Sequence, residues 1–306
     1  MRILIVASYN KGFFAPFIVE QGDCLQAYGH QVHYCGIVGK GLIGYLKAFP
    51  KLKNVIAEFQ PDVIHAHYGL CGLLANLQRR IPVVTTYHGS DINEKSVLPF
   101  SKLAIHLSAH NIFVSQRTID IAKPRRHYSL IPCGVNLFEI MDKTEARDLT
   151  GLKSGMRYVL FAGAFDNAVK NYPLAKKSVE LLDDVELLEL KGYSREDVNC
   201  LMCAADAIVM TSFAEGSPQV VKEAMTFGLP VVSVDVGDVA DIISGVAECF
   251  VAERSPSSIA ACLKEAFHFN RTSGRERIIE LGLDNDTIID KIISVYESVN
   301  SSNNQR

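Results

Sequence analysis

Short apolar runs alternate with longer amphipathic stretches along the first half of the chain. The apolar or β-branched runs predict strands at 2–7, 31–37, 62–66, 82–87, 110–115 and 128–132. Between the first two, a pattern with helical spacing at 14–28 ends at Gly29, a residue that suits the position after a helix. Strands that alternate with helices predict a parallel sheet covered by helices on both faces.

A second series of the same kind follows a polar stretch at 139–156, which we interpret as a linker. Its predicted strands lie at 158–163, 185–190, 206–210, 230–234 and 248–251. Helical patterns lie at 171–182, 195–204, 218–227, 256–267 and 286–299, the last with its isoleucines on one face.

The two series predict an α/β chain of two doubly wound, Rossmann-like domains that face each other across a cleft. The expected domains are 1–150 and 151–285, followed by a C-terminal helix and tail at 286–306. Packing of that helix back on the first domain is one option. In such sheets ligands bind beyond the carboxyl ends of the strands.

The composition is ordinary for a soluble globular protein. Of 306 residues, 48% are hydrophobic and 21% charged, which excludes collagen, low-complexity and simple coiled-coil classes. No apolar run approaches the roughly 18–20 residues that span a bilayer. The first eight residues are typical of a buried strand rather than a signal peptide. We therefore expect a cytoplasmic protein, with peripheral attachment to the inner membrane face as an option.

Charge and cysteine placement add two expectations. Residues 1–150 carry 16 Lys and Arg against 11 Asp and Glu, whereas residues 151–306 carry 15 against 23. The basic half favours an anionic partner but is too weakly charged for nucleic-acid binding. Eight cysteines lie mostly in apolar runs. Cys200 and Cys203 have C-x-x-C spacing inside a helical pattern, which favours packing over a redox or zinc role.

A basic, partly apolar stretch runs from Lys40 to Lys53. Its lysines alternate with Leu, Ile, Tyr and Phe residues, and Pro50 interrupts it. Two interpretations stay open, docking on an anionic membrane surface and a solvated edge of the first domain.

The strongest chemical signal is the segment from Phe213 to Met225, which follows a predicted strand and opens a helix. Ser217 suits the N-cap and Pro218 the first helical turn. The free amide groups at this helix start predict an anion site. Glu215 and Glu223 place carboxylates before the helix and along it. A capped surface helix with incidental carboxylates is the alternative.

This segment, with the spacing E-x7-E, resembles the nucleotide-sugar site of retaining glycosyltransferases of family 4, which have the GT-B fold. Other segments are similar to motifs of the same family, in the same order along nearly the whole chain. They are Gly29-His30-Gln31-Val32, Asp62-Val63-Ile64-His65-Ala66-His67, Tyr87-His88-Gly89-Ser90-Asp91, Ile131-Pro132-Cys133-Gly134 and Gly163 with Lys170-Asn171.

The chain departs from the family pattern at three positions. The family Arg after the glycine is Ala164 here, and Arg and Lys together normally neutralise the donor pyrophosphate. Cys133 replaces an Asn, and Asn136 replaces an acid. These changes bear on the affinity and identity of the donor more than on the fold.

The resemblance implies that residues 1–150 form the acceptor-binding domain and residues 151–285 the nucleotide-sugar-binding domain. It also implies roles for individual residues. His88 and Glu215 are the expected catalytic residues, acting on the transferred sugar. Lys170 supplies charge to the pyrophosphate, and Glu223 accepts hydrogen bonds from the ribose. The other expected nucleotide-sugar contacts are Gly12, Gly163, Tyr193, Ser217, Gln219 and Val220. Tyr193, placed beside the base, is equally well read as a packed loop tyrosine.

Three further signals favour structural roles. Asp91 suits a helix cap better than a ligand contact. His65 and His67 lie on one side of a strand, but no third metal ligand is evident. Asp284-Asn285-Asp286 has D-x-D spacing but lies at a helix start, where acids suit the dipole.

The sequence thus predicts a retaining, metal-independent transferase. It would move a sugar from a nucleoside-diphosphate sugar, a UDP-sugar preferred, to a saccharide or lipid-linked saccharide acceptor. Polysaccharide or glycolipid biosynthesis is the expected setting. The alternatives are an epimerase or phosphorylase of the same fold and a non-catalytic nucleotide-sugar-binding protein.

Overall fold

The computed structural model describes residues 1–303 and divides the chain into two compact units. The first unit holds Met1–Gly134 and the C-terminal segment from Asn285 onward, and the second holds Val135–Asp284. Of the tail expected at 301–306, residues 301–303 belong to the C-terminal helix, and residues 304–306 lie outside the described residues. No helix within residues 1–303 combines the length and apolar character that a membrane span needs.

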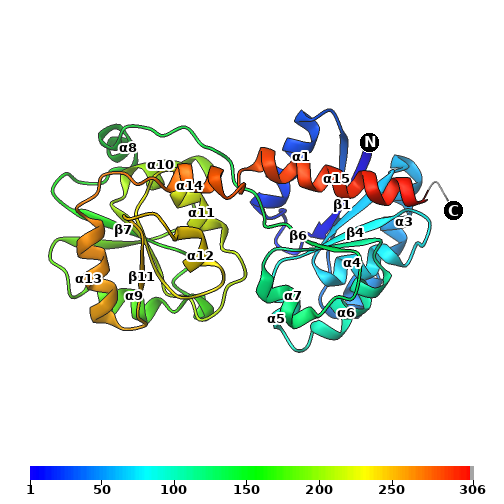
Figure 1. Cartoon of the computed structure of the whole chain (residues 1–306), viewed down its shortest axis with the longest axis horizontal. Helices are drawn as coiled ribbons and strands as arrows, with labels where there is room; N and C mark the ends of the chain where they lie inside the picture. The colour runs from blue at the N-terminus through cyan, green and yellow to red at the C-terminus, as the bar shows by residue number, and fades with distance from the viewer. Residues whose placement is uncertain (304–306) are drawn as a thin grey trace. The chain divides into compact units, whose positions relative to one another are not determined.

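The first unit is a parallel sheet of six strands in the order β2-β1-β3-β4-β5-β6 (Figure 1). The strands are β1 (Arg2–Ser8), β2 (Gln31–Ile37), β3 (Val63–His67), β4 (Val83–Tyr87), β5 (His110–Phe113) and β6 (Tyr128–Leu130). Its helices are α1 (Pro16–Ala27), α2 (Gly41–Leu46), α3 (Phe49–Phe59), α4 (Gly69–Asn76), α5 (Ser90–Asn93), α6 (Leu98–Leu107), α7 (Gln116–Ala122) and α15 (Asn285–Asn303).

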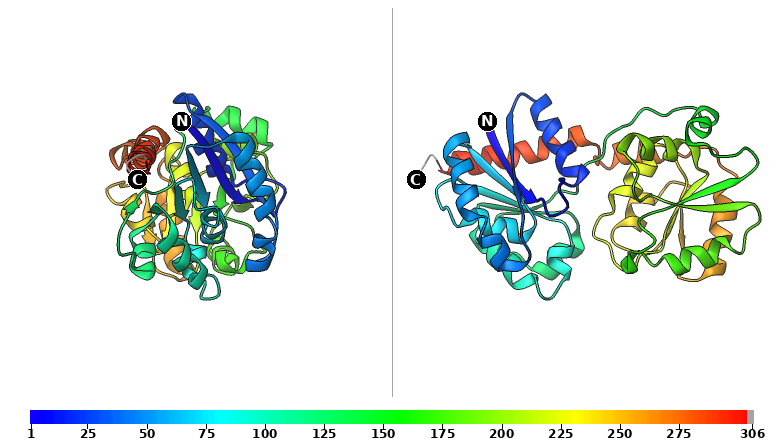
Figure 2. Two further views of the ribbon diagram at one scale, coloured as in Figure 1. Left: turned by 90° about the vertical axis from the view of Figure 1, so that its right-hand side faces the viewer. Right: turned by 180° about the vertical axis from the view of Figure 1, so that it is seen from behind.

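Helix α15 belongs to the first unit although it follows the second in sequence. It runs beside α1, as the views of Figures 1 and 2 agree. Its buried face, which includes Ile288, Ile292 and Tyr296, shares a core with Ile3 and Ile5 of β1. The isoleucines that mark this helix in the sequence therefore cover one face of the sheet, where apolar burial drives packing.

The second unit is a parallel sheet of five strands in the order β11-β10-β9-β7-β8. The strands are β7 (Arg157–Phe161), β8 (Val185–Glu189), β9 (Ala207–Met210), β10 (Val231–Val234) and β11 (Phe250–Ala252). Its helices are α8 (Lys143–Thr150), η1 (Ala168–Lys170, a 3-10 turn), α9 (Tyr172–Val179), α10 (Arg195–Ala204), α11 (Gln219–Thr226), α12 (Val239–Ile243), α13 (Pro256–Ala266) and α14 (Gly274–Glu280).

The polar stretch expected as a linker is part of this second unit, because it contains helix α8. Asp206, just before β9, is 2% exposed and forms ion pairs with Lys143, Arg147 and Arg157 at 2.7–2.9 Å. These cations hold the pKa of Asp206 below its usual value despite burial. The network ties α8 to the sheet, so the boundary falls at Gly134 rather than after residue 150.

Candidate active site

Three elements meet around Lys170 at the carboxyl end of the second sheet. Lys170 ends the η1 turn, which follows β7. Its side chain lies over Gly163, two residues after the end of β7 at Phe161. A Cβ at Gly163 would lie 2.7 Å from Cγ of Lys170. Gly163 is therefore required because the lysine stem occupies the space of a side chain.

The ammonium group of Lys170 forms an ion pair with Glu215, with 2.7 Å between Nζ and Oε1. Both side chains are mostly buried. The loop that carries Glu215 is backed by Gly237, whose φ is +63° and where a Cβ would lie 2.8 Å from the carbonyl oxygen of Gly216. The two predicted ligand-binding charges are thus paired with each other.

The start of α11 differs from the expectation in one respect. Pro218, not Ser217, is the N-cap, because its ψ of 115° is extended, and no side chain caps the helix. The helix begins at Gln219, so Gln219 and Val220 occupy its first turn, where amide groups have no intrahelical acceptor. The dipole of this helix start favours an anion, so an anion site here stays a prediction.

Glu223 lies one turn into α11 and is paired with a cation that the sequence analysis did not single out. The Arg195 guanidinium contacts Glu223, with 3.0 Å between Nη2 and Oε1, and it packs over the Phe138 ring at 4.8 Å. Arg195 opens α10 directly after its N-cap Ser194. Arg195 and Glu223 are 28 residues apart along the chain, so no local sequence pattern indicates this contact.

Two predicted features stand at the edge of this group. Tyr193, in the loop between β8 and α10, is 50% exposed. Ala164 stands where the family has an Arg and has no charged side chain. The cation that pairs with the carboxylate of Glu215 is Lys170. Desolvation raises the pKa of the half-buried Asp238, and the charge of Lys222, a fully buried lysine of α11, acts in the opposite direction.

In the first unit the predicted residues Gly12 and His88 follow β1 and β4. Gly12 has a φ of +78° with open space where a Cβ would be, so its backbone conformation, not crowding, requires glycine. His88 lies within hydrogen-bond distance of two groups. Its Nε2 is 3.0 Å from Nδ1 of His67, and its Nδ1 is 3.5 Å from Sγ of Cys133.

His88 is one end of a stack of three imidazoles, of which His65 and His67 are fully buried. The rings of His65 and His67 stack at 4.5 Å, and those of His67 and His88 at 5.2 Å. His65 Nε2 lies 2.7 Å from Oγ1 of Thr86, and its Nδ1 contacts the Tyr296 hydroxyl of α15. Burial lowers the pKa of His65 to about 3 and also lowers that of His67. Both rings are therefore neutral.

Asp91 supports the loop that carries His88. Its carboxylate accepts hydrogen bonds from the amides of His88, Gly89 and Gly69, each at 3.0 Å. Burial raises its pKa to about 6, while these hydrogen bonds act in the opposite direction. Asp91, itself in the first turn of α5, thus caps the start of α4 and fixes the backbone at His88.

Within the described residues no cluster of three His, Cys, Asp or Glu side chains has a metal-binding arrangement, and the eight cysteines are unbridged. The D-x-D segment opens α15, with Asp286 in its first turn.

Two family models match the chain. The Glycosyltransferase Family 4 model matches residues 17–138, and the Glycosyl transferases group 1 model matches residues 159–268. The chain belongs to the family 4-like glycosyltransferases. The first model covers the loops of His88 and the histidine stack, and the second covers Lys170, Glu215 and Glu223.

Two bacterial proteins resemble this glycosyltransferase in sequence. TuaC of Bacillus subtilis, a glycosyltransferase assigned to teichuronic acid biosynthesis, is 25% identical over 69% of this chain and 62% of its own length. WcaL of Salmonella typhimurium, assigned to colanic acid biosynthesis, is 25% identical over 83% of this chain and 70% of its own. The first match therefore spans less than two thirds of the relative.

Solved structures share the fold of this glycosyltransferase. Sucrose-phosphate synthase from Thermosynechococcus elongatus superposes with a TM-score of 0.84 and 16% identity, over 98% of this chain and 99% of that one. Anabaena Alr3699/HepE in complex with UDP-glucose has a TM-score of 0.75 and 16% identity, over 97% and 100% of the two chains. The fold is GT-B, with two parallel-sheet α/β domains.

Proposed function

We propose that this protein is a retaining glycosyltransferase that moves a sugar from a nucleoside-diphosphate sugar to an acceptor hydroxyl. The observation that carries the proposal is the group formed by Lys170, Glu215, Glu223 and the start of α11. It combines a cation and helix amides for a diphosphate with carboxylates for sugar hydroxyls. The structural neighbour HepE binds UDP and UDP-glucose, which favours a UDP-sugar.

The chemistry follows from where charge develops. The bond between the anomeric carbon and the diphosphate oxygen breaks, and a bond from the acceptor oxygen to the same carbon forms on the same face. The acceptor proton passes to the departing phosphate oxygen. Negative charge grows on the diphosphate, where Lys170 and the amides of Gln219 and Val220 stabilise it without a divalent cation. His88 of the first unit and Glu215 of the second are the residues that the family resemblance assigns to the transferred sugar.

The setting that the relatives favour is the synthesis of a cell-surface polysaccharide or glycolipid. The acceptor would then be a saccharide or a lipid-linked saccharide at the inner membrane face. The surface of α2 fits such a location, because Val38, Ile43 and Leu46 are exposed there beside Lys40 and Lys47. Apolar and cationic groups together favour docking on an anionic bilayer.

A thermal-shift screen of UDP-, GDP- and ADP-sugars tests the donor. Ligands that bind the folded state raise its melting temperature, so UDP-sugars should give the largest increase. Product analysis of the best donor then separates the alternatives. An epimerase converts the donor without an acceptor, a phosphorylase needs inorganic phosphate, and a non-catalytic protein binds without turnover. Absence of a shift with all three nucleotides contradicts the proposal.

A further inference from the structure

The last residue of β3, His67, makes a short polar contact with the imidazole of His88. Strands β3 and β4 are parallel neighbours with His67 in register with Thr86, so its side chain meets the residue that follows β4. Nδ1 of His67 lies 3.0 Å from Nε2 of His88. The His67 side chain is fully buried, whereas His88 is partly exposed. Any effect of His67 on a bound substrate therefore passes through His88.

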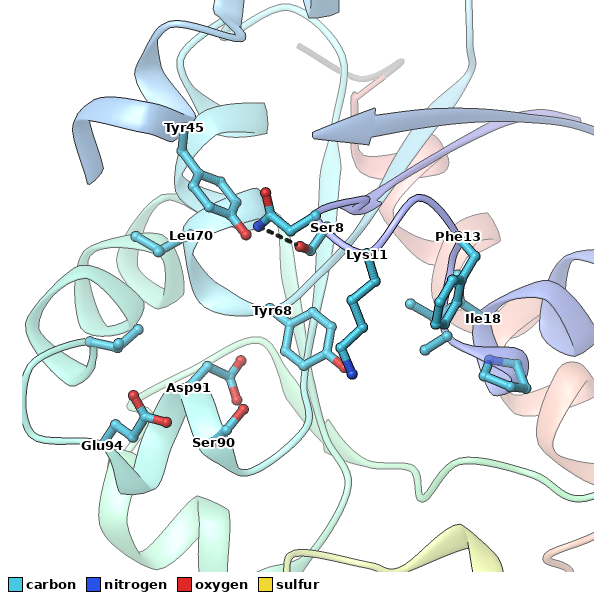
Figure 3. A pocket seen from close by; sticks show the side chains of 14 residues that line it. Ser8, Lys11, Phe13, Ile18, Tyr45, Tyr68, Leu70, Ser90, Asp91 and Glu94 are labelled. Atoms are coloured by element: carbon cyan, nitrogen blue, oxygen red, sulfur yellow. Dashed lines mark hydrogen bonds between the residues drawn. The ribbon is translucent and has the colours of Figure 1, made fainter. Parts of the chain in front are cut away.

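The His88 ring is held between aromatic neighbours. Its centroid lies 4.8 Å from that of Phe17, 4.7 Å from that of Tyr68 and 5.2 Å from that of His67. Tyr68 and Asp91 both line the pocket shown in Figure 3, and the Asp91 carboxylate accepts a hydrogen bond from the His88 amide. The ring cannot turn over to exchange its two nitrogens without displacing these neighbours.

The contact between the two imidazoles has two arrangements, because a neutral imidazole carries one N–H group and one bare nitrogen. In the first arrangement, Nδ1–H of His67 donates to Nε2 of His88, and the proton of His88 is on Nδ1. In the second arrangement, Nε2–H of His88 donates to Nδ1 of His67, and the proton of His67 is on Nε2. Nδ1 of His88 is therefore a hydrogen-bond donor in the first and an acceptor in the second.

The far nitrogen of His67 distinguishes the two arrangements. Nε2 of His67 is buried and has no hydrogen-bond partner among residues 1–303. In the second arrangement this atom is an N–H group without an acceptor, and in the first it is a bare nitrogen without a donor. A buried N–H group without an acceptor is the rarer of the two in folded proteins. The surroundings of His67 therefore favour the first arrangement.

The other nitrogen of His88 has a weaker partner. Its Nδ1 lies 3.5 Å from Sγ of Cys133, and a thiol is both a weak donor and a weak acceptor. Cys133 can therefore contact either form of His88 and selects neither strongly. The choice between the two forms is left to His67.

We propose that His67 is a positioning residue that keeps the proton of neutral His88 on Nδ1. His88 then exchanges its weak contact with Cys133 for a hydrogen bond that it donates to an oxygen of the transferred sugar, and it does not act as a base. This inference rests on the proposed transferase function, in which the acceptor proton passes to the departing phosphate oxygen. It adds the residue that sets the state of His88.

The test is long-range proton–nitrogen NMR of the full chain labelled with nitrogen-15 histidine, at about pH 8, where an ordinary imidazole is neutral. A bare ring nitrogen resonates far downfield of one that carries a proton, so the spectrum reports the position of the proton. Comparison with His88→Asn assigns the His88 signals. The wild type should show a protonated Nδ1 and a bare Nε2 at His88.

His67→Phe and His67→Leu remove the donor and should move the proton of His88 to Nε2, the form that histidine prefers in water. Both variants share the loss of the ring nitrogens but differ in size, so a common result reports the lost donor rather than a packing change. Cys133→Ala is the matched control at the other nitrogen of His88 and should leave the proton on Nδ1.

Steady-state kinetics measure the consequence for turnover. His67→Phe and His67→Leu should lower turnover about fivefold or more, the effect of one lost hydrogen bond. Their affinity for UDP, measured by calorimetry, should stay within about twofold of the wild type, because the predicted UDP contacts lie in the second unit. A merely structural role of His67 would not move the proton of His88.

Four outcomes overturn the inference. They are a wild-type His88 with its proton on Nε2, a proton that stays on Nδ1 in both His67 variants, a proton that moves in Cys133→Ala, and unchanged turnover in both His67 variants. The NMR measurement needs no substrate, so it stands apart from the proposed function. UDP binding and turnover with the proton on Nε2 contradict this inference alone, whereas absent UDP binding contradicts the proposed transferase function itself.

Discussion

At the scale of single residues, the charges of the second unit are compensated before any ligand binds. Lys170 is paired with Glu215, and Glu223 with Arg195. A charge-assisted bond to a diphosphate must therefore replace or share an existing ion pair, so its net gain is smaller than for a free lysine. The ion pairs also hold the side chains in place, which lowers the conformational entropy that binding has to remove.

Lys170→Ala should weaken UDP binding by at least ~1.5 kcal/mol, about tenfold, because Ala164 provides no second cation beside it. Isothermal calorimetry measures the change directly. Lys177→Ala, an exposed lysine on α9, is the matched control and should bind UDP like the wild type. Unchanged affinity in Lys170→Ala would falsify the assignment of this lysine to the diphosphate.

The two glutamates should separate in kinetics. Glu223→Ala removes the carboxylate that is proposed to accept hydrogen bonds from the ribose, so the affinity for free UDP should fall. Glu215→Ala should lower turnover and nearly keep UDP binding, because its loss frees the Lys170 ammonium rather than removing it. Calorimetry gives the affinities and steady-state rates give the turnover. The reverse pattern contradicts the proposed placement of ribose and sugar.

At the scale of elements, two histidines of strand β3 make the free energy of unfolding depend on pH. His65 and His67 are fully buried and neutral, with folded-state pKa values below the ordinary value of about 6.5. Below pH 6.5 the unfolded chain binds more protons at these histidines than the folded chain does. Their contribution to the free energy of unfolding is therefore largest above pH 6.5 and is lost as the pH falls towards 3. Asp91, with its pKa raised to about 6, acts in the opposite direction between about pH 4 and 6.

The free energy of unfolding should therefore fall between pH 7 and pH 5, by about 2 kcal/mol for His65 alone. Urea unfolding at the two pH values measures the difference. His67→Phe removes one of the two buried imidazoles and should show a smaller fall. His106→Gln, at an exposed position of α6, should show the same fall as the wild type. An equal fall in all three proteins contradicts the role of the buried stack.

At the scale of the whole molecule, the basic stretch expected from the sequence is split by the structure into different roles. Tyr45 and Leu52 are buried, and Lys51 donates to the carbonyl oxygen of Gly36 at 2.9 Å. The exposed apolar residue Ile43, with 72% of its surface accessible, lies on α2. The part of the stretch that fits membrane docking is therefore the outer side of α2 with the exposed lysines Lys40, Lys47 and, on α3, Lys53.

Replacing Lys40, Lys47 and Lys53 together with Glu should abolish sedimentation with phosphatidylserine vesicles, since each lysine near an anionic surface contributes on the order of 1 kcal/mol. High salt should weaken the wild-type association. Lys51 is left unchanged because its bond to Gly36 is structural.

A matched control changes the same number of charges in the second unit, at the exposed Lys153, Lys177 and Lys264. This variant should sediment like the wild type, and both variants should still bind UDP. If the wild-type protein does not sediment with anionic vesicles at low salt, membrane docking is contradicted and a water-soluble acceptor is favoured.

The sequence by itself determined the alternation of strands and helices, because the spacing of apolar residues records which side of each element is buried. Lys170, Glu215, Glu223 and His88 became candidates because the short motifs that hold them resemble those of family 4. The helix start at Gln219 was placed within a residue, and the error arose because Pro218 adopts an extended ψ instead of joining the helix.

Only the tertiary structure decided which of these groups touch. Arg195 reaches Glu223 from another helix, His67 reaches His88 from another strand, and α15 completes the core of the unit in which the chain begins. Such contacts join residues far apart in sequence and depend on side-chain direction and packing through space. No local pattern of apolar and polar residues records them, because that pattern reports burial and not the identity of the neighbour.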